Sequence, residues 1–359
     1  ISKDKKLTRT YEIKINVHQQ VADSLYWNQM AVRTLPGGIA DPDAQRTVQI
    51  GDAVYCMVSK GVDTRLSYTS DPAADAWTTI TPSLPQGASV ATLAAAGASL
   101  YILDEEENLY ASTDGEQWSA CGVKMHWLYG EYNGRLLGSS MDSGNWKIVS
   151  YPAGIEMDAP EGFPVEGASQ MLQFETKWAQ LPTAVMVGGR TSDGSLTSAT
   201  WGFDGNTWSV ISMTSLPQGL EGVALVPYFT YRTSTTTWAI TLHTTLFAIG
   251  GRTADGVAQR NVYVSMDNGV NWHLADQYLQ LPDYIPAMSD AQGFVYESVI
   301  HARSASSAWH ACEPTALPAW WVIAPAQRSR AVAPIEEWDC PYIYLFGGVD
   351  ANGLLANTI

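Results

Sequence analysis

The chain has 359 residues, and its 20 Lys and Arg against 36 Asp and Glu give a formal net charge of −16. This excess of negative charge repels nucleic acid phosphates and anionic lipid surfaces, so neither is expected as a partner. Charged residues make up only 16% of the chain, whereas 14 Trp, 17 Tyr and 30 Gly are present. Such a composition is typical of an all-β protein with many turns.

No apolar run reaches the roughly 18 to 20 residues that span a bilayer, so we expect no transmembrane segment. The first residues include no apolar signal region, and any secretion signal or lipid anchor is expected upstream of residue 1. The four cysteines, Cys56, Cys121, Cys312 and Cys340, form no Cys-x-x-Cys pair, and the six histidines are dispersed. We therefore predict neither a metal site nor a cofactor, and leave the disulfide state open.

Residues 11–17 alternate apolar and polar side chains, as a half-buried strand does. Two interpretations of residues 1–21 stay open: an N-terminal arm, or the last strand of an immunoglobulin-like domain that lies upstream. The second is favoured because a lone strand is unstable in water. Residues 22–359 are assigned to the domain that follows.

A hairpin motif that ends in tryptophan recurs along this domain. It reads Leu-Tyr-Ala-Ser-Thr-Asp-Gly-Glu-Gln-Trp over 109–118 and Val-Tyr-Val-Ser-Met-Asp-Asn-Gly-Val-Asn-Trp over 262–272, with weaker copies at 66–77 and 200–208. In each copy an aspartate can accept backbone N–H groups in a turn, and the tryptophan begins the next strand. The aspartates expected to close turns rather than to bind a ligand are Asp114, Asp204 and Asp267.

Two further elements accompany the hairpin. An apolar strand ending in Gly-Gly occurs at 185–189, 247–251 and 344–348, and a Leu-Pro turn follows the tryptophan at 84–85 and 216–217. Each unit thus reads as four antiparallel strands, which describes one blade of a β-propeller. Counting the outer strands predicts six blades, at Trp77, Trp118, 145–154, Trp208, Trp272 and after Gly347–Gly348.

The last unit reaches Ile359 without a tryptophan, and the missing strand is expected at the other end of the domain. Trp27 is followed by Leu35 and Pro36, the same order as in the other units. An N-terminal strand that completes the last blade would remove open sheet edges and close the ring. We therefore predict a monomeric, all-β, six-bladed β-propeller with four-stranded blades, closed by its N-terminal strand.

Residues 265–272 resemble the Asp-box, or BNR repeat, of sialidase-like propellers, and residues 112–118 resemble the same box with one residue deleted. The Gly-Gly pairs resemble kelch repeats. Together these motifs are similar to kelch-like surface proteins of unassigned function from Bacteroides-type gut bacteria. The resemblance implies a propeller with an extracellular, cell-surface or periplasmic location. It selects no activity, because propellers host hydrolases, oxidases, lectins and scaffolds.

The Gly-Gly loops carry candidate ligand-binding residues. The hairpin turns lie at one end of the strands, so the loops after Gly-Gly emerge at the opposite end, which makes Arg190 and Arg252 neighbours in adjacent blades. Guanidinium groups bind carboxylates in bidentate fashion, which favours recognition of a carboxylate. The alternative is that each arginine pairs with the aspartate three residues later, Asp193 or Asp255, and closes its own loop.

The arginine pair also resembles that of a sialidase, which needs a third arginine, a tyrosine nucleophile and an acidic residue. Tyr231 and Arg232 are the candidates, but the Arg-Ile-Pro segment of sialidases is absent and no pair of carboxylates stands out by spacing.

Residues 298–338 depart from the repeat by about 35 additional residues and contain Trp320 and Trp321. Exposed aromatic rings stack on sugars, although these two could instead cap the core of their blade.

The sequence thus favours a secreted or cell-surface module that binds a glycan or a protein and is not an enzyme. A sialidase-like glycoside hydrolase and a purely structural module are the alternatives. A hydrolase requires a deep axial pocket with two close carboxylates, and a binding module requires a shallow aromatic groove. The candidate ligand-binding residues are Arg190, Arg252, Asp193, Asp255, Tyr231, Trp320 and Trp321.

Overall fold

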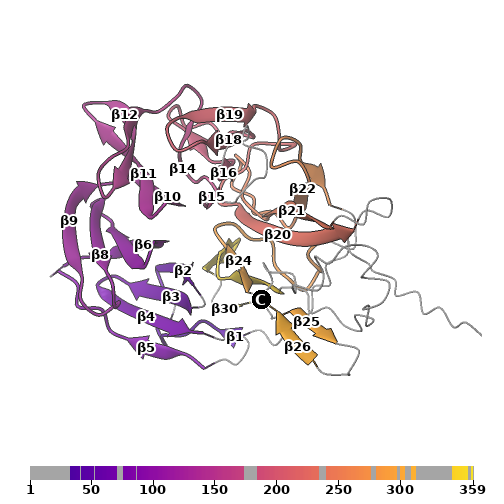
Figure 1. Cartoon of the computed structure of the whole chain (residues 1–359). Helices are drawn as coiled ribbons and strands as arrows, with labels where there is room; N and C mark the ends of the chain where they lie inside the picture. Colours follow the sequence, from indigo (N-terminus) through magenta and orange to yellow (C-terminus); the bar gives the residue numbers. More distant parts are fainter. Residues whose placement is uncertain are drawn as a thin grey trace, which may run out of the picture.

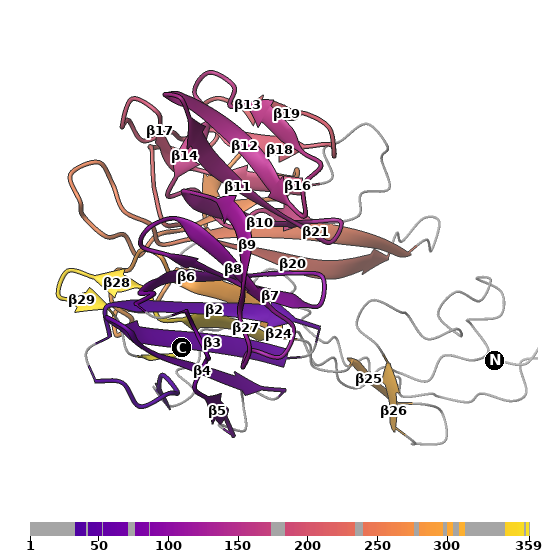
Figure 2. The same cartoon turned by 90° about the vertical axis from the view of Figure 1, so that its left-hand side faces the viewer.

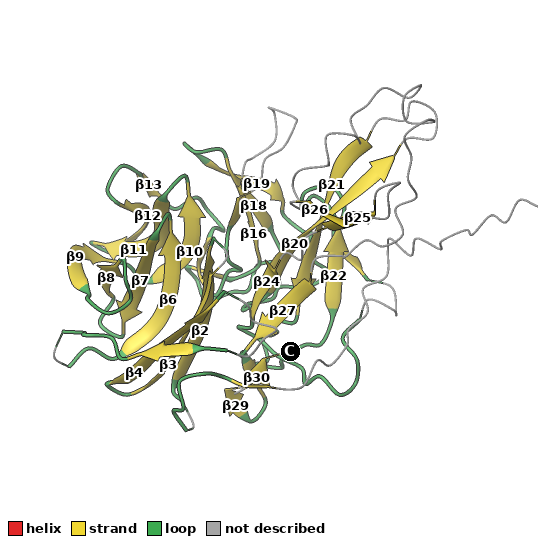
Figure 3. Cartoon of the chain, turned by 60° about the horizontal axis from the view of Figure 1, so that its bottom comes forward, coloured by secondary structure: helices red, strands yellow, loops and turns green. Residues whose placement is uncertain are grey.

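The structure is a computed structural model in which strands and turns account for the described residues (Figure 3). Within these residues, no helix is long and apolar enough to cross a membrane. The described residues are 33–40, 42–51, 53–70, 76–85, 87–173, 184–233, 240–275, 280–296, 300–303, 309–312, 342–354 and 357–358.

Five blades are built from four antiparallel strands that follow one another in the chain (Figure 1). Blade 1 contains β2 (Ala44–Ile50), β3 (Ala53–Lys60), β4 (Asp63–Thr69) and β5 (Thr78–Ile80). Blade 2 contains β6 (Val90–Ala96), β7 (Ser99–Asp104), β8 (Asn108–Ser112) and β9 (Ser119–Lys124). Blade 3 contains β10 (Trp127–Tyr132), β11 (Arg135–Asp142), β12 (Asn145–Tyr151) and β13 (Glu156–Asp158). Blade 4 contains β15 (Leu172–Gln173), β16 (Ala184–Val187), β18 (Thr200–Phe203) and β19 (Trp208–Ser212), and blade 5 contains β20 (Ala224–Thr233), β21 (Ile240–Ile249), β22 (Val262–Ser265) and β23 (His273–Leu274).

The structure therefore shows five such blades, where the sequence led us to expect six. A further four-stranded sheet, called here the closing sheet, has the order β1-β30-β27-β24 and takes strands from both ends of the domain. It differs from the blades because its two outer strands have only two residues each. Trp27, around which we expected the completing strand, lies outside the described residues, as do residues 1–21. The strands of the closing sheet are β24 (Gln292–Tyr296), β27 (Tyr342–Phe346), β30 (Asn357–Thr358) and β1 (Arg33–Thr34).

Three two-stranded pairings complete the described strands. The first joins the segment that enters blade 4 to the loop that follows Gly188 and Gly189. The pairs are β14 (Pro164–Glu166) with β17 (Arg190–Thr191), β25 (Ile300–Arg303) with β26 (Trp309–Cys312), and β28 (Val349–Asp350) with β29 (Gly353–Leu354).

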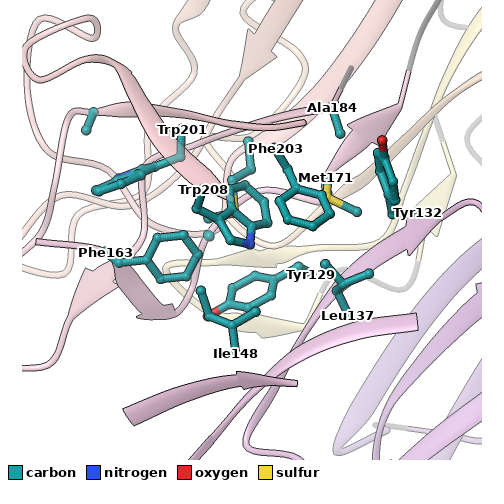
Figure 4. Close-up of a cluster of buried hydrophobic side chains, with 13 residues drawn as sticks. Tyr129, Tyr132, Leu137, Ile148, Phe163, Met171, Ala184, Trp201, Phe203 and Trp208 are labelled. Carbon is teal, nitrogen blue, oxygen red and sulfur yellow. The ribbon is translucent and has the colours of Figure 1, made fainter. Parts of the chain in front are cut away.

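Apolar clusters between neighbouring sheets form the core. Strict alternation places one side of each strand against the next sheet, and the interface of blades 3 and 4 is rich in aromatic residues (Figure 4). Phe203 stacks on Trp208 with ring centroids 4.9 Å apart, and Tyr132 meets Phe203 edge to face at 4.8 Å. The closing sheet packs on blade 1 through Phe346 and on blade 5 through Leu345.

The hairpin turns confirm the structural role predicted for the aspartates. Asp114 accepts backbone N–H groups from Glu116 and Gln117, at 2.8 and 2.9 Å. These bonds lower the pKa of Asp114, because they favour the ionised carboxylate. Trp118 follows this turn, donates from Nε1 to the Gly115 carbonyl at 2.9 Å and packs into the core. Asp204 and Asp267 accept backbone N–H groups in their own turns in the same way.

The antiparallel order gives the domain two faces. The Asp turns, between the third and fourth strands of blades 2, 4 and 5, define the hairpin face. The loops between second and third strands, and the segments that enter each blade, define the opposite Gly-Gly face. In Figure 2 this face lies at the left, near β17 and β28, whereas the long strands β20 and β21 extend to the right.

Candidate functional site

Glycine is needed where the loops of the Gly-Gly face meet the next sheet. Gly188 and Gly250 have φ of 69° and 68°, a region that favours glycine. A Cβ on Gly188 would lie 2.4 Å from the carbonyl oxygen of Leu220, and one on Gly250 would lie 2.5 Å from that of Met288. Each of these Gly-Gly pairs thus allows close contact with the backbone that enters the next sheet. The arginine two residues later is thereby placed at a boundary between blades.

Arg190 and Arg252 do come together, as the sequence predicted, but a carboxylate lies between them. Arg190 Nη2 donates to both carboxylate oxygens of Glu221 at 2.8 Å, and its Nε donates to Oε2 at 3.1 Å. Arg252 Nε donates to Oε1 at 3.1 Å. Glu221 is 7% exposed, so its charge is compensated mainly by these two guanidinium groups. The hydrogen bonds to Glu221 raise the pKa of Arg190, although burial opposes the shift.

The alternative pairing of each arginine with the aspartate of its own loop is wrong. Asp193 accepts from the Thr191 hydroxyl at 2.5 Å and from the Ser195 backbone N–H at 3.0 Å. Asp255 accepts from the Thr253 hydroxyl. These bonds lower the pKa of both aspartates, with the threonine hydroxyl the largest cause in each. The aspartates therefore shape the loops, whereas both arginines reach across the blade boundary to Glu221. Arg190 Nη1 also donates to the Gly194 carbonyl of its own loop at 2.8 Å.

Further ion-pair contacts lead from Arg190 to groups of blades 3 and 2. Glu166 Oε1 lies 3.6 Å from Arg190 Nε, and Glu166 Oε2 lies 3.1 Å from His126 Nε2. His126 Nδ1 lies 2.7 Å from Glu107 Oε1. Charged groups thus form a continuous chain across four blades, called here the Gly-Gly-face network. Its members are Glu107, His126, Glu166, Arg190, Glu221 and Arg252.

Four members of this network were not found from the sequence. For Glu166 and Glu221 a signal exists, because each precedes a glycine shortly after a proline turn, in Pro164-Val-Glu-Gly and Pro217-Gln-Gly-Leu-Glu-Gly. The residue that follows each has φ of 65°. For Glu107 and His126 the sequence gives no such signal, because neither stands in one of the motifs that recur between blades.

A small axial cavity lies at the Gly-Gly end of the inner strands. Its volume is about 20 Å³, which is room for one or two water molecules. Arg46 and Asp290 supply its charges, and Trp127 forms part of its wall. The guanidinium carbon of Arg46 lies 5.9 Å from the Trp127 ring centroid. Among the described lining residues Asp290 is the one carboxylate.

Burial lowers the pKa of Arg46, and the charge of Asp290 opposes this shift. Arg46 Nε and Trp127 Nε1 are buried and donate no hydrogen bond within the described part of the chain. Asp290 Oδ2 accepts from the Ser289 hydroxyl at 2.8 Å. The axis thus carries one cation and one anion rather than a pair of acids.

Backbone hydrogen bonds link the entries of consecutive sheets beside this cavity. The Gly222 N–H donates to the Gly167 carbonyl at 2.8 Å, and the Asp290 N–H donates to the Gly222 carbonyl at 2.7 Å. The three residues share φ near 60°, at 65°, 65° and 59°. Asp290 therefore occupies a left-handed position that its two counterparts fill with glycine.

A wider groove lies on the same face of blade 1, called here the blade-1 groove. It has a volume of about 240 Å³ and is formed by the β3–β4 turn and the Leu84–Pro85 turn. Its described lining combines aliphatic and proline carbons with the Arg65–Asp63 ion pair and contains no aromatic ring. Val62, 69% exposed, stands at its rim.

Tyr231 lies away from the Gly-Gly end of its strand. The backbone of Tyr231 pairs with Leu242, seven residues before β21 ends at Ile249. At the rise of a strand this places Tyr231 roughly 20 Å along the hairpin from the Gly-Gly end. Trp320 and Trp321 lie outside the described residues.

No group of three or more His, Cys, Asp or Glu side chains that could hold a metal occurs within the described ranges. The cysteines described with their side chains, Cys56 and Cys121, are free. Burial raises the pKa of the Cys56 thiol to about 11, which disfavours the reactive thiolate.

Comparison with solved structures finds distant similarity. A structure of YjhT is 13% identical, with 89% of this chain and 99% of that chain covered and a TM-score of 0.49. YCF48 bound to D1 peptide is 16% identical, covers 70% of this chain and 72% of its own, and has a TM-score of 0.35. The α-L-arabinofuranosidase Arb93A from Fusarium graminearum, in complex with an iminosugar inhibitor, is 11% identical, with coverages of 77% and 90% and a TM-score of 0.42.

No curated protein matches the chain. The model of the DUF6242 beta propeller domain matches residues 21–359. This match spans all five blades and the closing sheet. The chain belongs to the DUF6242 beta propeller domain family.

Proposed function

We propose that the closing sheet serves as a sixth blade and that the N-terminal strand seals the ring. The packing of Phe346 on blade 1 and of Leu345 on blade 5 supports this arrangement. So does the contact of the inner strands around the axis, from β2 through β6, β10, β15, β20 and β24 back to β2. In this arrangement the β1–β30 pairing covers an outer sheet edge that would otherwise be open.

We further propose that this domain is a non-enzymatic binding module, secreted or at the cell surface, that engages a glycan or a protein through its Gly-Gly face. The observation that carries the proposal is the contrast between a filled axis and an open groove on the same face. The axial cavity holds about 20 Å³ and one carboxylate, whereas the blade-1 groove holds about 240 Å³. Of the two ligand classes, the groove favours an extended protein segment, because its described lining offers no ring on which a sugar can stack.

The competing proposal, a sialidase-like glycoside hydrolase, has less support from the described residues. Hydrolysis of a glycosidic bond by side chains generally needs two acidic groups about 5 to 10 Å apart on either side of the bond. Arg190 and Arg252 already share the Glu221 carboxylate, and none of these three residues lines the axial cavity. The arginine pair therefore helps to hold the face together, and a free carboxylate ligand would compete with Glu221 for it.

The test is a binding screen of the whole domain against a glycan array and a peptide array, with Val62→Trp to fill the blade-1 groove. Val257→Trp is the matched control, because Val257 is 53% exposed on a loop of the same face in blade 5. We expect peptide binding that Val62→Trp weakens at least tenfold and Val257→Trp leaves unchanged. Equal binding by both variants would contradict the groove assignment. Release of sugar from a panel of glycosides would contradict the non-enzymatic proposal.

A further inference from the structure

His126 lies between two carboxylates that come from different parts of the ring. Its Nδ1 is 2.7 Å from Glu107 Oε1, in the β7–β8 turn of blade 2, and its Nε2 is 3.1 Å from Glu166 Oε2, in β14 before blade 4. Ionised carboxylates only accept hydrogen bonds, and a neutral imidazole carries a hydrogen on one nitrogen alone. Both contacts are hydrogen bonds only when the ring carries two hydrogens and a positive charge.

The backbone around His126 keeps its ring between the two carboxylates. The His126 N–H donates to the Ser139 carbonyl at 2.7 Å, and the Met125 N–H donates to the Glu107 carbonyl at 3.0 Å. The ring meets Trp146 edge to face, with centroids 5.0 Å apart. The backbone of His126 is thus held between the two carboxylates. Loss of the ring proton removes the donor from one of the two contacts and leaves a nitrogen lone pair facing a carboxylate.

The turn that carries Glu107 is fixed as well. Buried Asp104 accepts backbone N–H groups from Glu106 and Asn108, at 3.0 and 2.7 Å. Glu107 itself has a φ of 67°, within the left-handed region. The Glu107 carboxylate thus faces His126 from a turn whose backbone is held by the hydrogen bonds to Asp104.

The other charged groups around the ring balance only part of this negative charge. Arg190 faces Glu166 at 3.6 Å but bonds mainly to Glu221. Lys124, at the end of β9, donates to the Glu106 carbonyl at 2.9 Å. Burial lowers the pKa of His126, but the hydrogen bonds and charges of Glu107 and Glu166 outweigh it, so the pKa lies above its ordinary value of 6.5.

We propose that His126 is a proton-operated clasp on the Gly-Gly face, which ties blade 2 and the entry of blade 4 to blade 3 when it is charged and releases one of them when it is neutral. This regulation is independent of the ligand. The stabilisation is fully present below the pKa of 6.5 that the unfolded chain would have, and it is lost as pH rises through the raised pKa of the folded state. His126 directly precedes Trp127, so the clasp adjoins the wall of the axial cavity.

The direct test measures the His126 pKa by NMR of the whole domain with labelled histidine, assigned by comparison with His126→Gln. We expect the wild-type pKa above 6.5, a lower value in Glu107→Gln and in Glu166→Gln, and a value below 6.5 in the double variant, where only burial remains. A wild-type pKa at or below 6.5, or a double variant with the wild-type value, would overturn the proposal.

A second measurement compares urea unfolding of the wild type and His126→Gln between pH 5.5 and 9. His273→Gln is the control for loss of a histidine, because His273 is exposed in β23. The difference in unfolding midpoint between wild type and His126→Gln should shrink steadily as pH rises, while the control shows no such trend. A difference that stays constant or grows with pH would contradict a clasp that charge closes. Should His126→Gln not fold, Glu107→Gln and Glu166→Gln still decide, because the histidine signal whose pKa both of them lower is that of His126.

Discussion

The two faces of this propeller use carboxylates in opposite ways. On the hairpin face, Asp114 accepts from residues two and three positions later, within one turn of one blade. On the Gly-Gly face, Glu221 binds Arg190 and Arg252, each 31 positions away and on opposite sides of it in the sequence. The first kind of contact closes a single hairpin, and the second holds neighbouring blades together.

This difference predicts that the two faces contribute differently to the stability of the domain. At the hairpin face the hydrogen bonds of each Asp turn lie within one blade, so the loss of one such bond should weaken that turn alone. At the Gly-Gly face the charged groups and the glycines contact neighbouring blades, so the loss of one such contact should weaken the packing between blades. Variants on the Gly-Gly face should therefore cost more stability than variants on the hairpin face.

The largest effect is expected from Gly222→Ala. A Cβ at this position would lie 2.6 Å from Asp290 Oδ1 and 2.9 Å from the Asp290 backbone nitrogen, and φ is +65°. Left-handed strain and the cross-sheet clash together should lower the free energy of unfolding by about 3 kcal/mol.

Gly144→Ala sharpens this prediction, because Gly144 has φ of +84° and open space where the Cβ would lie. It should cost only the strain of about 1 kcal/mol. Equal losses in urea unfolding of the two variants would show that the contact between sheet entries contributes nothing.

The next effect is expected from Glu221→Gln, which removes the charge between Arg190 and Arg252. Removing one partner of a buried ion pair costs several kcal/mol, but the arginine side chains are 32% and 36% exposed and regain part of their solvation. We expect a loss of about 2 kcal/mol in urea unfolding. Exposed Glu161→Gln is the control and should change stability by less than about 0.5 kcal/mol. A loss no larger than the control would break the contrast between the faces.

The smallest effect is expected from Asp114→Asn on the hairpin face. The backbone N–H groups of Gln117 and Glu116 lower the pKa of Asp114 below its ordinary value of 3.8. The carboxylate therefore stabilises the fold above pH 3.8, and this contribution disappears as pH falls through the lowered pKa. Acid unfolding should show a smaller difference between wild type and Asp114→Asn at pH 2 than at pH 5. A loss at pH 5 that exceeds that of Glu221→Gln would reverse the order of the two faces.

The sequence predicted the features that depend on neighbours in the chain. The blade repeat, the turn closed by Asp114 and the outer strands at Trp77, Trp118, Trp208 and Trp272 follow from short motifs and are present. The outer strand expected at 145–154 is wrong, because β12 is the third strand of blade 3 and β13 lies outside it. The approach of Arg190 to Arg252 also followed, because strand direction alone decides the face on which a loop emerges. The β-propeller domain is confirmed by the match over residues 21–359, whereas the resemblance to kelch-like and Asp-box surface proteins stays a prediction.

The remaining features depend on which segments meet across blades. Glu221 could not be chosen as the partner of both arginines, because a local aspartate was the obvious alternative for each. The distance of Tyr231 from the Gly-Gly end could not be predicted, since nothing in the motif shows that β20 and β21 have ten residues each and β22 only four. The sheet after blade 5 was counted from the sequence as a sixth blade with strands from both ends of the domain, but the motifs do not show that β1 and β30 have only two residues each.

The left-handed backbone of Asp290 has a consequence for symmetry. Gly167 and Gly222 occupy the corresponding position in the preceding two entries without strain, whereas an aspartate there costs roughly 1 to 2 kcal/mol. A propeller designed with the Gly222 segment repeated at the start of every blade would carry glycine at the position of Asp290. The Arg46 guanidinium would then have no opposite charge in the axial cavity. The negative charge in the axial cavity thus comes from Asp290, the one of these three positions that is not glycine, and a fully symmetric redesign would remove it.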